Sequence, residues 1–274
     1  MTDPAPAASH ARTILAAHEH RRSIAPLTGW DPTLDLPAAY RVAAEVRRLR
    51  VARGERPVGR KIGFTNTTLW DRYGVRAPIW GDIYDTTLCD RAALAGPVAL
   101  AAFVEPRIEP EIVFELARAP EPGMDAAALI GCVAWAAAGF EIVQSLYPGW
   151  RFTAPDTVAA FGLHGLLVVG ERVPIIAAER PAWIGRLEGF SVDLLRDGVL
   201  AERGRGRNVM GKGPLAALGH LVDVLANDPP SPPLAAGEII TTGTLTDALP
   251  VAPRHCWQAR IDGLPLPDLD LTVI

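Results

Sequence analysis

The stretch Glu105-Pro-Arg-Ile-Glu109-Pro-Glu111-Ile-Val-Phe-Glu115-Leu116 decides the fold. At the two-residue period of a β-strand, its apolar side chains share one face: Ile108, Ile112, Phe114 and Leu116. The other face carries Arg107, Glu109, Glu111, Val113 and Glu115. On a helix, residues two apart point about 200° away from each other, so Glu109 and Glu111 could not converge. A strand instead places their carboxylates on one side, about 6–7 Å apart along the chain.

Two carboxylates this close repel each other unless a cation or a proton lies between them. The pair is therefore either the solvated, charged face of a strand or half of an oxygen-rich site for Mg²⁺ or Mn²⁺. Further along, Phe140-Glu141-Ile-Val-Gln-Ser145 places a single charge in an apolar, strand-like run. A buried carboxylate costs several kcal/mol unless it is paired or coordinated. Glu141 is thus a candidate third ligand, or it pairs with an arginine such as Arg151.

Composition excludes several functional classes. The chain has 274 residues, of which 49% are hydrophobic and 21% charged, and this predicts a globular protein with a sizeable core. Its formal charge of −4 argues against a general nucleic-acid binder, because such domains usually carry a basic face. Near-P-loop residues Gly206 to Gly213 lack the hydroxyl that binds Mg²⁺, which disfavours nucleotide binding.

The sequence also predicts the cellular compartment of the protein. The three cysteines are widely spaced and form no CxxC pair, so they predict neither a disulfide framework nor a zinc site. The residues after Met1 do not resemble a signal peptide. The longest uncharged run, Ala126 to Phe140, is shorter than the ~18–20 residues of a membrane span. We therefore expect a cytoplasmic protein that does not bind membranes.

Lysine is rare in this chain. Lys61 and Lys212 are the only two lysines among 27 lysine and arginine residues. Lysine, unlike arginine, can lose its proton when it is desolvated and can then serve as an acid or base. Each of the two is therefore a candidate functional residue, although composition alone explains them equally well.

Residues 1–56 are predicted to form a helical N-terminal lobe. A short helix is expected around His10 to Ser23, with His18 and His20 on the surface because they lie two residues apart. A second helix is expected from Asp35 to Arg53, since Asp35 is followed by Pro37 near the first turn and Gly54 can end the helix.

Residues 57–274 are predicted to form the catalytic domain, which begins with a strand over Pro57 to Thr65. Two glycines interrupt that strand, and glycine in a strand often marks the close approach of a ligand or another backbone. Lys61 and Gly63 therefore lie where a substrate could contact the main chain. We further expect a strand from Val98 to Val104 and an Asp125-capped helix that ends at Gly139.

The last third of the chain is expected to be rich in strands. Asp197-Gly198 and Asp262-Gly263 each lie between alternating apolar residues, which is a strong signal for a hairpin. Pro214 to Leu225 predicts an amphipathic helix, and Gly237 to Thr244 predicts a strand that ends in a glycine–threonine turn.

Two further polar residues are candidates for function. Asp156 follows a loop rich in proline, glycine and aromatic residues, and it could be a helix cap, an acceptor for a neighbouring group or an acid/base. His164 opens a strand that runs to Gly170, where a structural histidine is more common than a catalytic one.

Several of these motifs, taken in order, resemble the 2-keto-4-pentenoate hydratase/4-oxalocrotonate decarboxylase group of the fumarylacetoacetate hydrolase superfamily. The matching segments are Gly59-Arg-Lys61-Ile-Gly63, Ile108-Glu109-Pro-Glu111-Ile112, Phe140-Glu141-Ile-Val-Gln-Ser145, Asp156-Thr-Val-Ala159 and Thr242-Gly243. The resemblance extends from about residue 35 to the C-terminus. It implies an α+β fold, a mixed β-sheet roll with a helical N-terminal lobe, commonly in homo-oligomers. Trp70, Trp80 and Trp150 would suit such an interface.

The resemblance also implies a site. Glu109, Glu111 and Glu141 match the ligands of one Mg²⁺ or Mn²⁺. Lys61 matches an active-site lysine whose pKa the metal keeps low, and Asp156 matches an acidic position that could orient water or Lys61. Gly63 borders the substrate. Thr242 and Thr244 are candidates to hold the substrate carboxylate.

The implied activity is that of a divalent-metal-dependent hydratase, a carbon–oxygen lyase. It would add water to a 2-hydroxydienoate or 2-oxo-enoate through a metal-stabilised enolate, in the degradation of aromatic or related compounds. A decarboxylase of the 4-oxalocrotonate type and an acylpyruvate-type C–C hydrolase need the same site and remain alternatives, as does a catalytically idle member with a structural role. Metal content would separate the idle member from the enzymes.

The chain departs from the hydratase pattern after Asp156. Where the family often has Asp-Asn-Ala-Ser, this chain has Ala160-Phe-Gly-Leu-His164. The pocket is therefore predicted to be more apolar and to accept a bulkier 2-oxo acid. We also hypothesise that His164 takes part in proton transfer.

Overall fold

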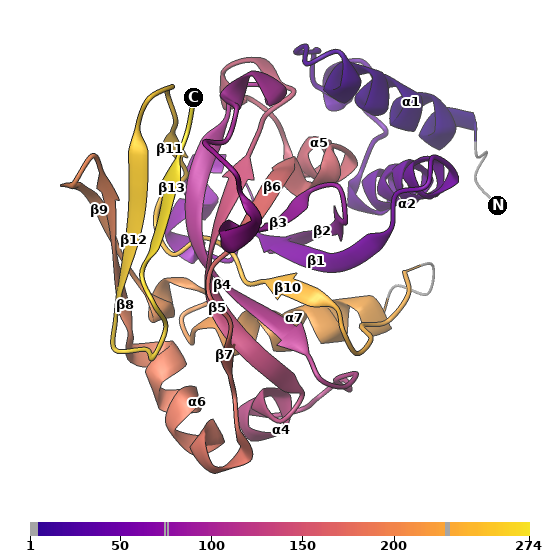
Figure 1. Ribbon diagram of the computed structural model, residues 1–274. Coiled ribbons are helices and arrows are strands. Elements are labelled where there is room, and N and C mark those ends of the chain that lie inside the picture. The colour runs from indigo at the N-terminus through magenta and orange to yellow at the C-terminus, as the bar shows by residue number, and fades with distance from the viewer. Residues whose placement is uncertain (1–4, 74, 76, 228–230) are drawn as a thin grey trace.

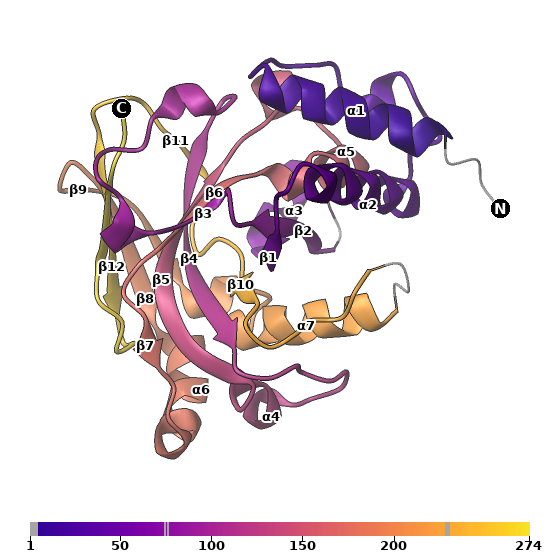
Figure 2. The same ribbon diagram turned by 45° about the vertical axis from the view of Figure 1, so that its right-hand side comes forward.

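A strongly curved nine-stranded sheet forms the centre of the computed structural model, which describes residues 5–73, 75, 77–227 and 231–274 (Figures 1 and 2). The first four residues of the predicted lobe lie outside it. The main strand order is β2-β1-β10-β4-β5-β6-β3, while β11 pairs with β4 and β7 with β5. The strands are β1 Pro57–Gly63, β2 Ile79–Tyr84, β3 Leu88–Asp90, β4 Arg107–Leu116, β5 Val133–Val143, β6 His164–Val169, β7 Val173–Pro174, β10 Ile239–Thr241 and β11 Leu249–Pro250. Two of the pairings, β1 with β10 and β3 with β6, are parallel, so the sheet is mixed.

Strand β4 is the expected strand, with the expected division of faces. Its four apolar residues, Ile108, Ile112, Phe114 and Leu116, are at most 1% exposed and belong to the main core. Antiparallel pairing with β5 sets Glu109 opposite Glu141 and Glu111 opposite Gly139. Residues directly opposite each other in such a pair have Cβ atoms about 4.5–5.5 Å apart. The register therefore brings the three glutamates together.

A second sheet of four strands closes the other side of the core, at the left of Figure 1. Its order is β13-β12-β8-β9, with β8 Ser191–Arg196, β9 Val199–Arg205, β12 Cys256–Asp262 and β13 Leu269–Thr272. The Asp197-Gly198 turn joins β8 to β9 as predicted, and β12 pairs with β13 across a longer loop. Inward-facing residues such as Val192, Trp257 and Leu271 pack in the same core as β4.

The helices form two groups. Helices α1 Ala5–Glu19, α2 Leu36–Ala52 and α5 Ala154–Ala159 pack together at the upper right of Figure 1, and the short α3 spans Trp70–Tyr73. Helices α4 Ala126–Ile130, α6 Arg180–Gly189 and α7 Pro214–Ala226 contribute to the main core. The predicted cap of α2 is confirmed, because Asp35 Oδ1 accepts a hydrogen bond from Ala38 N at 2.8 Å.

The expected helix from Asp125 to Gly139 is wrong over most of its length. Asp125 does cap a helix, but α4 ends at Ile130 and β5 begins at Val133. Residues 133–139 are rich in alanine, which favours a helix locally. Here, however, all of these residues except Ala134 pair with β4, and β6 and β7 pair with part of the other edge, so this tertiary context overrides the local preference.

Two smaller expectations also need correction. The predicted strand from Val98 to Val104 is instead a 3₁₀ turn at Leu100–Ala102, because Val98 and Leu100 bond to the C-terminal residues. Trp80 is not an exposed interface residue: it is 8% exposed and its ring stacks on Tyr40.

The N-terminal helices share a core with parts of the roll. Apolar residues of α1 and α2 pack against α5 and against β2 and the 104–161 segment, through Ile79, Tyr147 and Phe161. The lobe boundary between residues 56 and 57 stays a prediction. No helix in the described part of the chain is long and apolar enough to cross a membrane.

His18 is half-buried, so its predicted surface position is wrong, whereas His20 is exposed. The His18 ring packs edge-on against Phe161 at 5.1 Å. Burial, aided by the nearby positive charge of Arg50 and opposed by Glu55 and Glu19, lowers the pKa of His18 from 6.5 to about 4.

We expect this histidine to make the fold acid-sensitive. The unfolded chain binds the proton near pH 6.5 and the folded chain only near pH 4, so its contribution to stability is complete above pH 6.5 and is lost as the pH falls towards 4. A His18→Phe variant keeps a ring against Phe161 but has no proton to bind. Its urea midpoint should therefore fall less than that of the wild type between pH 7.5 and pH 5. Equal falls in both proteins would contradict this account.

Candidate metal centre

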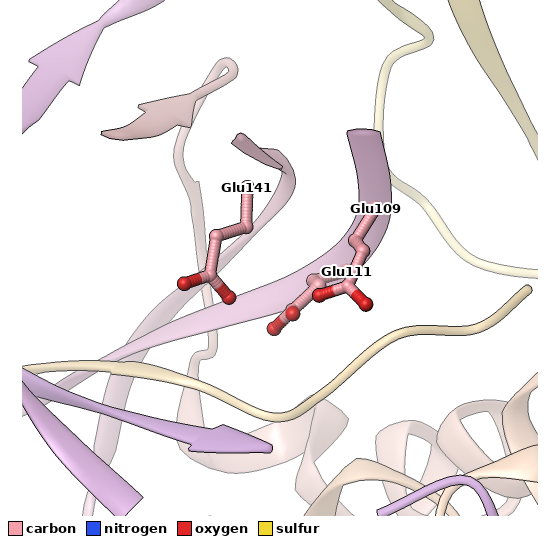
Figure 3. A group of neighbouring side chains, drawn as sticks. All are labelled: Glu109, Glu111 and Glu141. Carbon is pink, nitrogen blue, oxygen red and sulfur yellow. The ribbon is translucent and has the colours of Figure 1, made fainter. Parts of the chain in front are cut away.

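Three glutamates meet at the middle of the curved sheet (Figure 3). One carboxylate oxygen from each of Glu109, Glu111 and Glu141 lies within 4.8 Å of the others. Glu111 and Glu141 are 1% and 0% exposed, while Glu109 is partly exposed and lines a pocket. The residues predicted to be ligands are thus brought together by the β4–β5 register.

Lys61 is the cation of this cluster. Its Nζ lies 3.3 Å from Glu141 Oε2 and donates a hydrogen bond to Gly162 O at 3.0 Å. Lys61 lies on β1, which is separated from β4 by the single strand β10. Its long side chain can therefore reach the glutamates of β4 and β5. It is 2% exposed, and it is the lysine that the sequence singled out; Lys212, the other one, is exposed on the surface.

The carboxylates carry more negative charge than their neighbours offset. Burial raises the pKa of Glu109 to about 7, against the pull of Lys61, and burial together with Glu141 raises that of Glu111 well above its usual value. Burial also opposes ionisation of Glu141, but Lys61 and a hydrogen bond from His164 lower its pKa to about 2.

The carboxylates in turn hold the proton on Lys61. Burial alone would lower its pKa, but Glu141, Glu109 and Glu111 outweigh burial and raise it. The low lysine pKa implied by the family resemblance refers to a site with a divalent cation, which would offset those negative charges.

The donor set fits a hard divalent cation. Glu111 Oε1 and Glu141 Oε2 are buried, and neither has a hydrogen-bond partner among the residues that the structure describes, although Glu141 Oε2 forms an ion pair with Lys61 Nζ at 3.3 Å. An unsatisfied buried carboxylate oxygen is costly, and coordination to a cation removes that cost. Because all three donors are carboxylates, the cluster suits Mg²⁺ or Mn²⁺ better than a metal that prefers nitrogen or sulfur.

A glycine turn holds the buried glutamate. Gly243 N donates to Glu111 Oε2 at 2.8 Å. Gly243 has φ +92°, and a Cβ there would lie 1.8 Å from Thr65 Oγ1, so only glycine fits. Thr242 Oγ1 donates to Ile112 O at 2.9 Å, which fastens the turn to β4. Thr244 lines the pocket, and its hydroxyl donates to Thr246 O.

A pocket opens beside Lys61 and Glu109. A Cβ on Gly63 would lie 3.3 Å from Lys61 Nζ, so the missing side chain keeps the approach to the amine open. Most of the remaining wall is apolar, and it includes Gly162 and Leu163 of the segment that departs from the family pattern. The lining residues are Lys61, Gly63, Phe64, Asn66, Ile79, Glu109, Val143, Trp150, Gly162, Leu163, Thr244 and Ala248.

Asp156 lies apart from this group. It is buried at the start of α5, where its carboxylate accepts hydrogen bonds from N and Oγ1 of both Thr28 and Thr153. Thr153 is the N-cap and Asp156 is the third helical residue, so Asp156 is not itself the cap. These contacts tie the N-terminal segment to α5, and a catalytic role for Asp156 stays a prediction.

Sequence reasoning missed three contributors to the site. Gly162 O accepts a hydrogen bond from Lys61 Nζ, Gly243 N donates one to Glu111, and Thr87 bonds to His164. The glycine-rich turn around Gly243 was a usable signal, whereas the other two contacts depend on tertiary geometry. His164 does not line the pocket, and both of its ring nitrogens bond to protein groups.

Comparison with known proteins agrees with this geometry. No family model matches the chain. The 2-keto-4-pentenoate hydratase of Paraburkholderia phymatum is 33% identical over 265 residues, which cover 96% of this chain and 97% of that protein. The 4-oxalocrotonate decarboxylase of Pseudomonas putida G7, solved with magnesium and adipate, is 26% identical with a TM-score of 0.88 over 100% of this chain and 99% of that one.

A fumarylacetoacetate hydrolase family structure from Yersinia pestis shares only the fold, at 16% identity and a TM-score of 0.56 over 80% of this chain and 94% of that one. The hydratase aligns with nearly the whole chain, and the curved sheet brings the three glutamates together. Both observations assign the chain to the same family. This chain belongs to the 2-keto-4-pentenoate hydratase/4-oxalocrotonate decarboxylase group of the fumarylacetoacetate hydrolase superfamily.

Proposed function

We propose that this protein is a divalent-metal-dependent hydratase that adds water to a 2-hydroxydienoate or its 2-oxo-enoate form, in the degradation of aromatic or related compounds. The observation that carries the proposal is the convergence of three carboxylates beside a buried lysine and a pocket. The 33% identity to a hydratase over nearly the whole chain supports the choice of reaction.

Glu109, Glu111 and Glu141 would hold the ion. A bound Mg²⁺ or Mn²⁺ supplies positive charge that stabilises the negative charge developing on the 2-oxo oxygen of the substrate. The protein's contribution is to fix the three carboxylates before the ion arrives: the β4–β5 pairing sets their spacing and Gly243 N holds Glu111.

Lys61 is the proposed proton carrier. Its Nζ is at the pocket wall, where it can hold a proton and deliver it to the substrate carbon during ketonisation or take one from water during addition. Gly162 O fixes the direction of the amine. Gly63 leaves room for the substrate next to Nζ. Thr244 lines the pocket, and contact with the substrate carboxylate would require its hydroxyl to turn from Thr246 O.

The other two predicted residues, Thr242 and Asp156, do not line the pocket and are hydrogen-bonded within the protein. The Thr242 hydroxyl is engaged with Ile112 O, which favours a contribution through the shape of the turn. Asp156 fastens α5 to Thr28, and we assign it no contact with substrate.

The pocket wall favours a substrate with an uncharged distal end. Beyond Lys61 and Glu109, the described lining residues are apolar or neutral, and they include Trp150 and Leu163. The Arg107 guanidinium lies 4.1 Å from the centre of the Trp150 ring but does not line the pocket, so a second carboxylate in the substrate would be desolvated without a further cation in the wall itself, which is costly. This favours the hydratase reading over a decarboxylase that acts on a dicarboxylate.

The test is a screen of 2-hydroxydienoic acids with Mg²⁺ or Mn²⁺. We expect loss of the conjugated chromophore with alkyl-substituted monoacids, little turnover of the matching diacids and no release of CO₂. Chelation of the metal should stop the reaction. Rapid CO₂ release from a diacid would instead assign the decarboxylase, and cleavage of an acylpyruvate would assign the C–C hydrolase.

We also propose that copies of this chain associate and that the protein works in the cytoplasm. Edge strand β9 exposes Val199 by 70% and Leu200 by 50%, and a second copy could cover these side chains. Light scattering of the wild type and of a Val199→Asp/Leu200→Asp variant tests the association. The three free cysteines are consistent with a reducing compartment.

A further inference from the structure

We propose that His164 is a positioning residue that fixes the orientation of the Glu141 carboxylate, and that Thr87 fixes His164 in turn. The inference rests on the proposed metal site, because its purpose is to present one particular oxygen of Glu141 to the ion. It replaces the hypothesis that His164 transfers protons to the substrate, since the ring does not reach the pocket.

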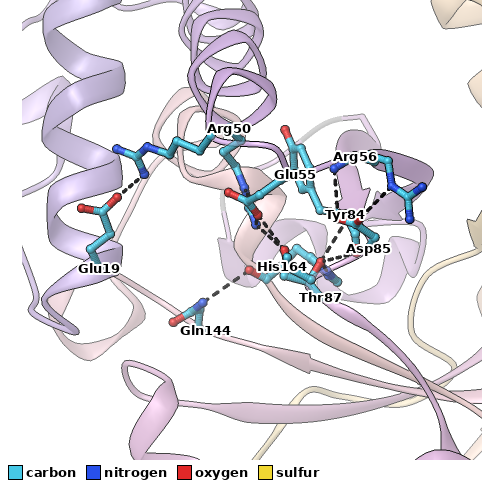
Figure 4. A network of polar contacts seen from close by, with 11 residues as sticks. Glu19, Arg50, Glu55, Arg56, Tyr84, Asp85, Thr87, Gln144 and His164 are labelled. Carbon is cyan, nitrogen blue, oxygen red and sulfur yellow. Dashed lines mark hydrogen bonds and ion pairs between the residues drawn. The ribbon is translucent and has the colours of Figure 1, made fainter.

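The His164 imidazole makes two hydrogen bonds, one at each ring nitrogen. His164 opens β6 and is 3% exposed. Its Nδ1 lies 2.8 Å from Glu141 Oε1 and its Nε2 lies 2.9 Å from Thr87 Oγ1. Figure 4 shows the ring beside Thr87, with the other members of the polar network around it. Both ring nitrogens are thus committed to protein groups on opposite sides.

The direction of these bonds follows from the available donors. An ionised carboxylate can only accept, so His164 Nδ1 carries the hydrogen and donates it to Glu141. In the neutral ring Nε2 then accepts from the Thr87 hydroxyl. That hydroxyl in turn accepts from Tyr84 N at 3.1 Å. It also lies 3.2 Å from Tyr84 O, a carbonyl that already accepts from Thr87 N at 2.9 Å, so its single hydrogen is shared between Tyr84 O and His164 Nε2. Thr87 thus anchors the Nε2 side of the ring to the 84–87 segment.

This arrangement gives the two oxygens of Glu141 different environments. Oε1 is occupied by His164, whereas Oε2 faces Lys61 Nζ at 3.3 Å and accepts no hydrogen bond from the described residues. The terminal torsion of a glutamate has a broad, two-fold preference, so the side chain itself does not fix the plane of the carboxylate. The imidazole supplies that constraint and leaves Oε2 for the ion.

A turn with left-handed backbone conformations precedes His164 and sets its position. Phe161, Gly162 and Leu163, which lie between α5 and β6, all have positive φ, at 61°, 63° and 66°. The left-handed conformation costs a non-glycine residue on the order of 1 kcal/mol, so two such residues are retained only where the surroundings impose them. The turn aims Gly162 O at Lys61 and starts β6 so that His164 meets Glu141.

The turn that carries Thr87 is braced by the end of α2. Thr86 Oγ1 donates to Glu55 Oε2 at 2.6 Å, and Arg50 Nη2 donates to the same oxygen at 2.6 Å. The Arg50 guanidinium also lies 3.8 Å from the centre of the Tyr84 ring. These contacts hold the 84–87 segment and give Thr87 a fixed position from which to orient His164 (Figure 4).

The experiment is calorimetric titration of the whole protein with Mn²⁺. Loss of a residue that orients a metal ligand typically weakens binding 10- to 100-fold. We therefore expect His164→Leu to bind Mn²⁺ about 10- to 100-fold more weakly than the wild type. Thr87→Val leaves the ring in place but unanchored, and it should weaken binding by a smaller factor. His164→Gln can still donate to Glu141 and should recover part of the affinity.

His20→Leu is the matched control, because His20 is an exposed histidine whose Nδ1 bonds only locally, to Ala16 O. It should bind Mn²⁺ as the wild type does. With saturating Mn²⁺, kcat of the His164 variants should return towards the wild-type value, because His164 acts through the ligand and does not touch substrate. Circular dichroism verifies that each variant is folded, and if His164→Leu is not, His164→Gln and Thr87→Val decide the question.

Wild-type affinity in folded His164 and Thr87 variants would overturn this inference and leave the proposed function intact. Absence of stoichiometric Mn²⁺ binding to the wild type would refute the proposed function itself. The two failures are therefore distinguishable within one set of titrations.

Discussion

Glu111→Gln should abolish tight binding of the divalent ion and reduce turnover by roughly 10³-fold or more, since charge stabilisation by a metal is worth several kcal/mol and each 1.36 kcal/mol is tenfold in rate. Glutamine has nearly the same shape, and its carbonyl can still accept from Gly243 N. The substitution therefore removes an anionic ligand from a buried cluster while the turn stays supported. Calorimetry with Mn²⁺ and the dienoate assay would measure the two effects.

Glu115→Gln is the matched control for this change. Glu115 lies on the same strand, β4, and on the same face by the two-residue period, but it is not part of the three-carboxylate cluster. It should bind Mn²⁺ and turn over substrate like the wild type. Equal activity in the Glu111 and Glu115 variants would show that the cluster is not the centre of the chemistry.

Lys61→Met should reduce kcat by about 10²- to 10⁴-fold, the usual contribution of a positioned acid or base, and it should leave metal binding in place. Methionine is similar in length and tolerates the buried position, but it cannot hold a proton. Removing the ammonium also removes a positive charge 3.3 Å from Glu141 Oε2, so the affinity for Mn²⁺ should stay equal or increase. Single-turnover kinetics at saturating Mn²⁺ would isolate the loss.

Lys212→Met provides the control, because it replaces the only other lysine of the chain, at an exposed position. It should leave kcat unchanged. A Lys61→Met enzyme with wild-type kcat would remove Lys61 from the proposed chemistry, and loss of metal binding together with kcat would recast it as a structural partner of Glu141.

The parts of the site that depend on local periodicity could be predicted from the sequence. The two-residue alternation around Glu109 and Glu111 identified β4 and the side on which its carboxylates lie. The rarity of lysine drew attention to Lys61 and Lys212 alike, and the two glycines in the strand that holds Lys61 favoured that one. An isolated charge in an apolar run pointed to Glu141. Each of these signals lies within a few residues, and the curved sheet then joins them.

The parts that depend on tertiary context could not be predicted. The alanines of residues 133–139 favour a helix by local preference and become strand because β4 pairs along one edge of the segment and β6 and β7 pair with part of the other. Glu141 was found although part of its own strand was predicted to be a helix. The left-handed turn at Phe161 and Leu163 has no signal in its residue types, because both residues ordinarily avoid positive φ.

Likewise, nothing in the sequence pairs His164 with Thr87, which lies 77 positions away. Asp156 shows that a motif can identify a residue without identifying its contacts. The family resemblance suggested an acidic residue near the chemistry, whereas its observed partners are Thr28 and Thr153, which join the N-terminal segment to α5. The position of an acidic residue in a motif therefore does not establish what its carboxylate contacts.

The most direct test of the account is a crystal structure of the protein grown with Mn²⁺, with data collected at a wavelength where manganese scatters anomalously. We predict one strong anomalous peak per chain, bonded to a carboxylate oxygen of each of Glu109, Glu111 and Glu141 at about 2.0–2.3 Å, a range typical of hard divalent cations bound by carboxylates. A cluster without such a peak, or a peak bound elsewhere in the protein, would contradict the central claim.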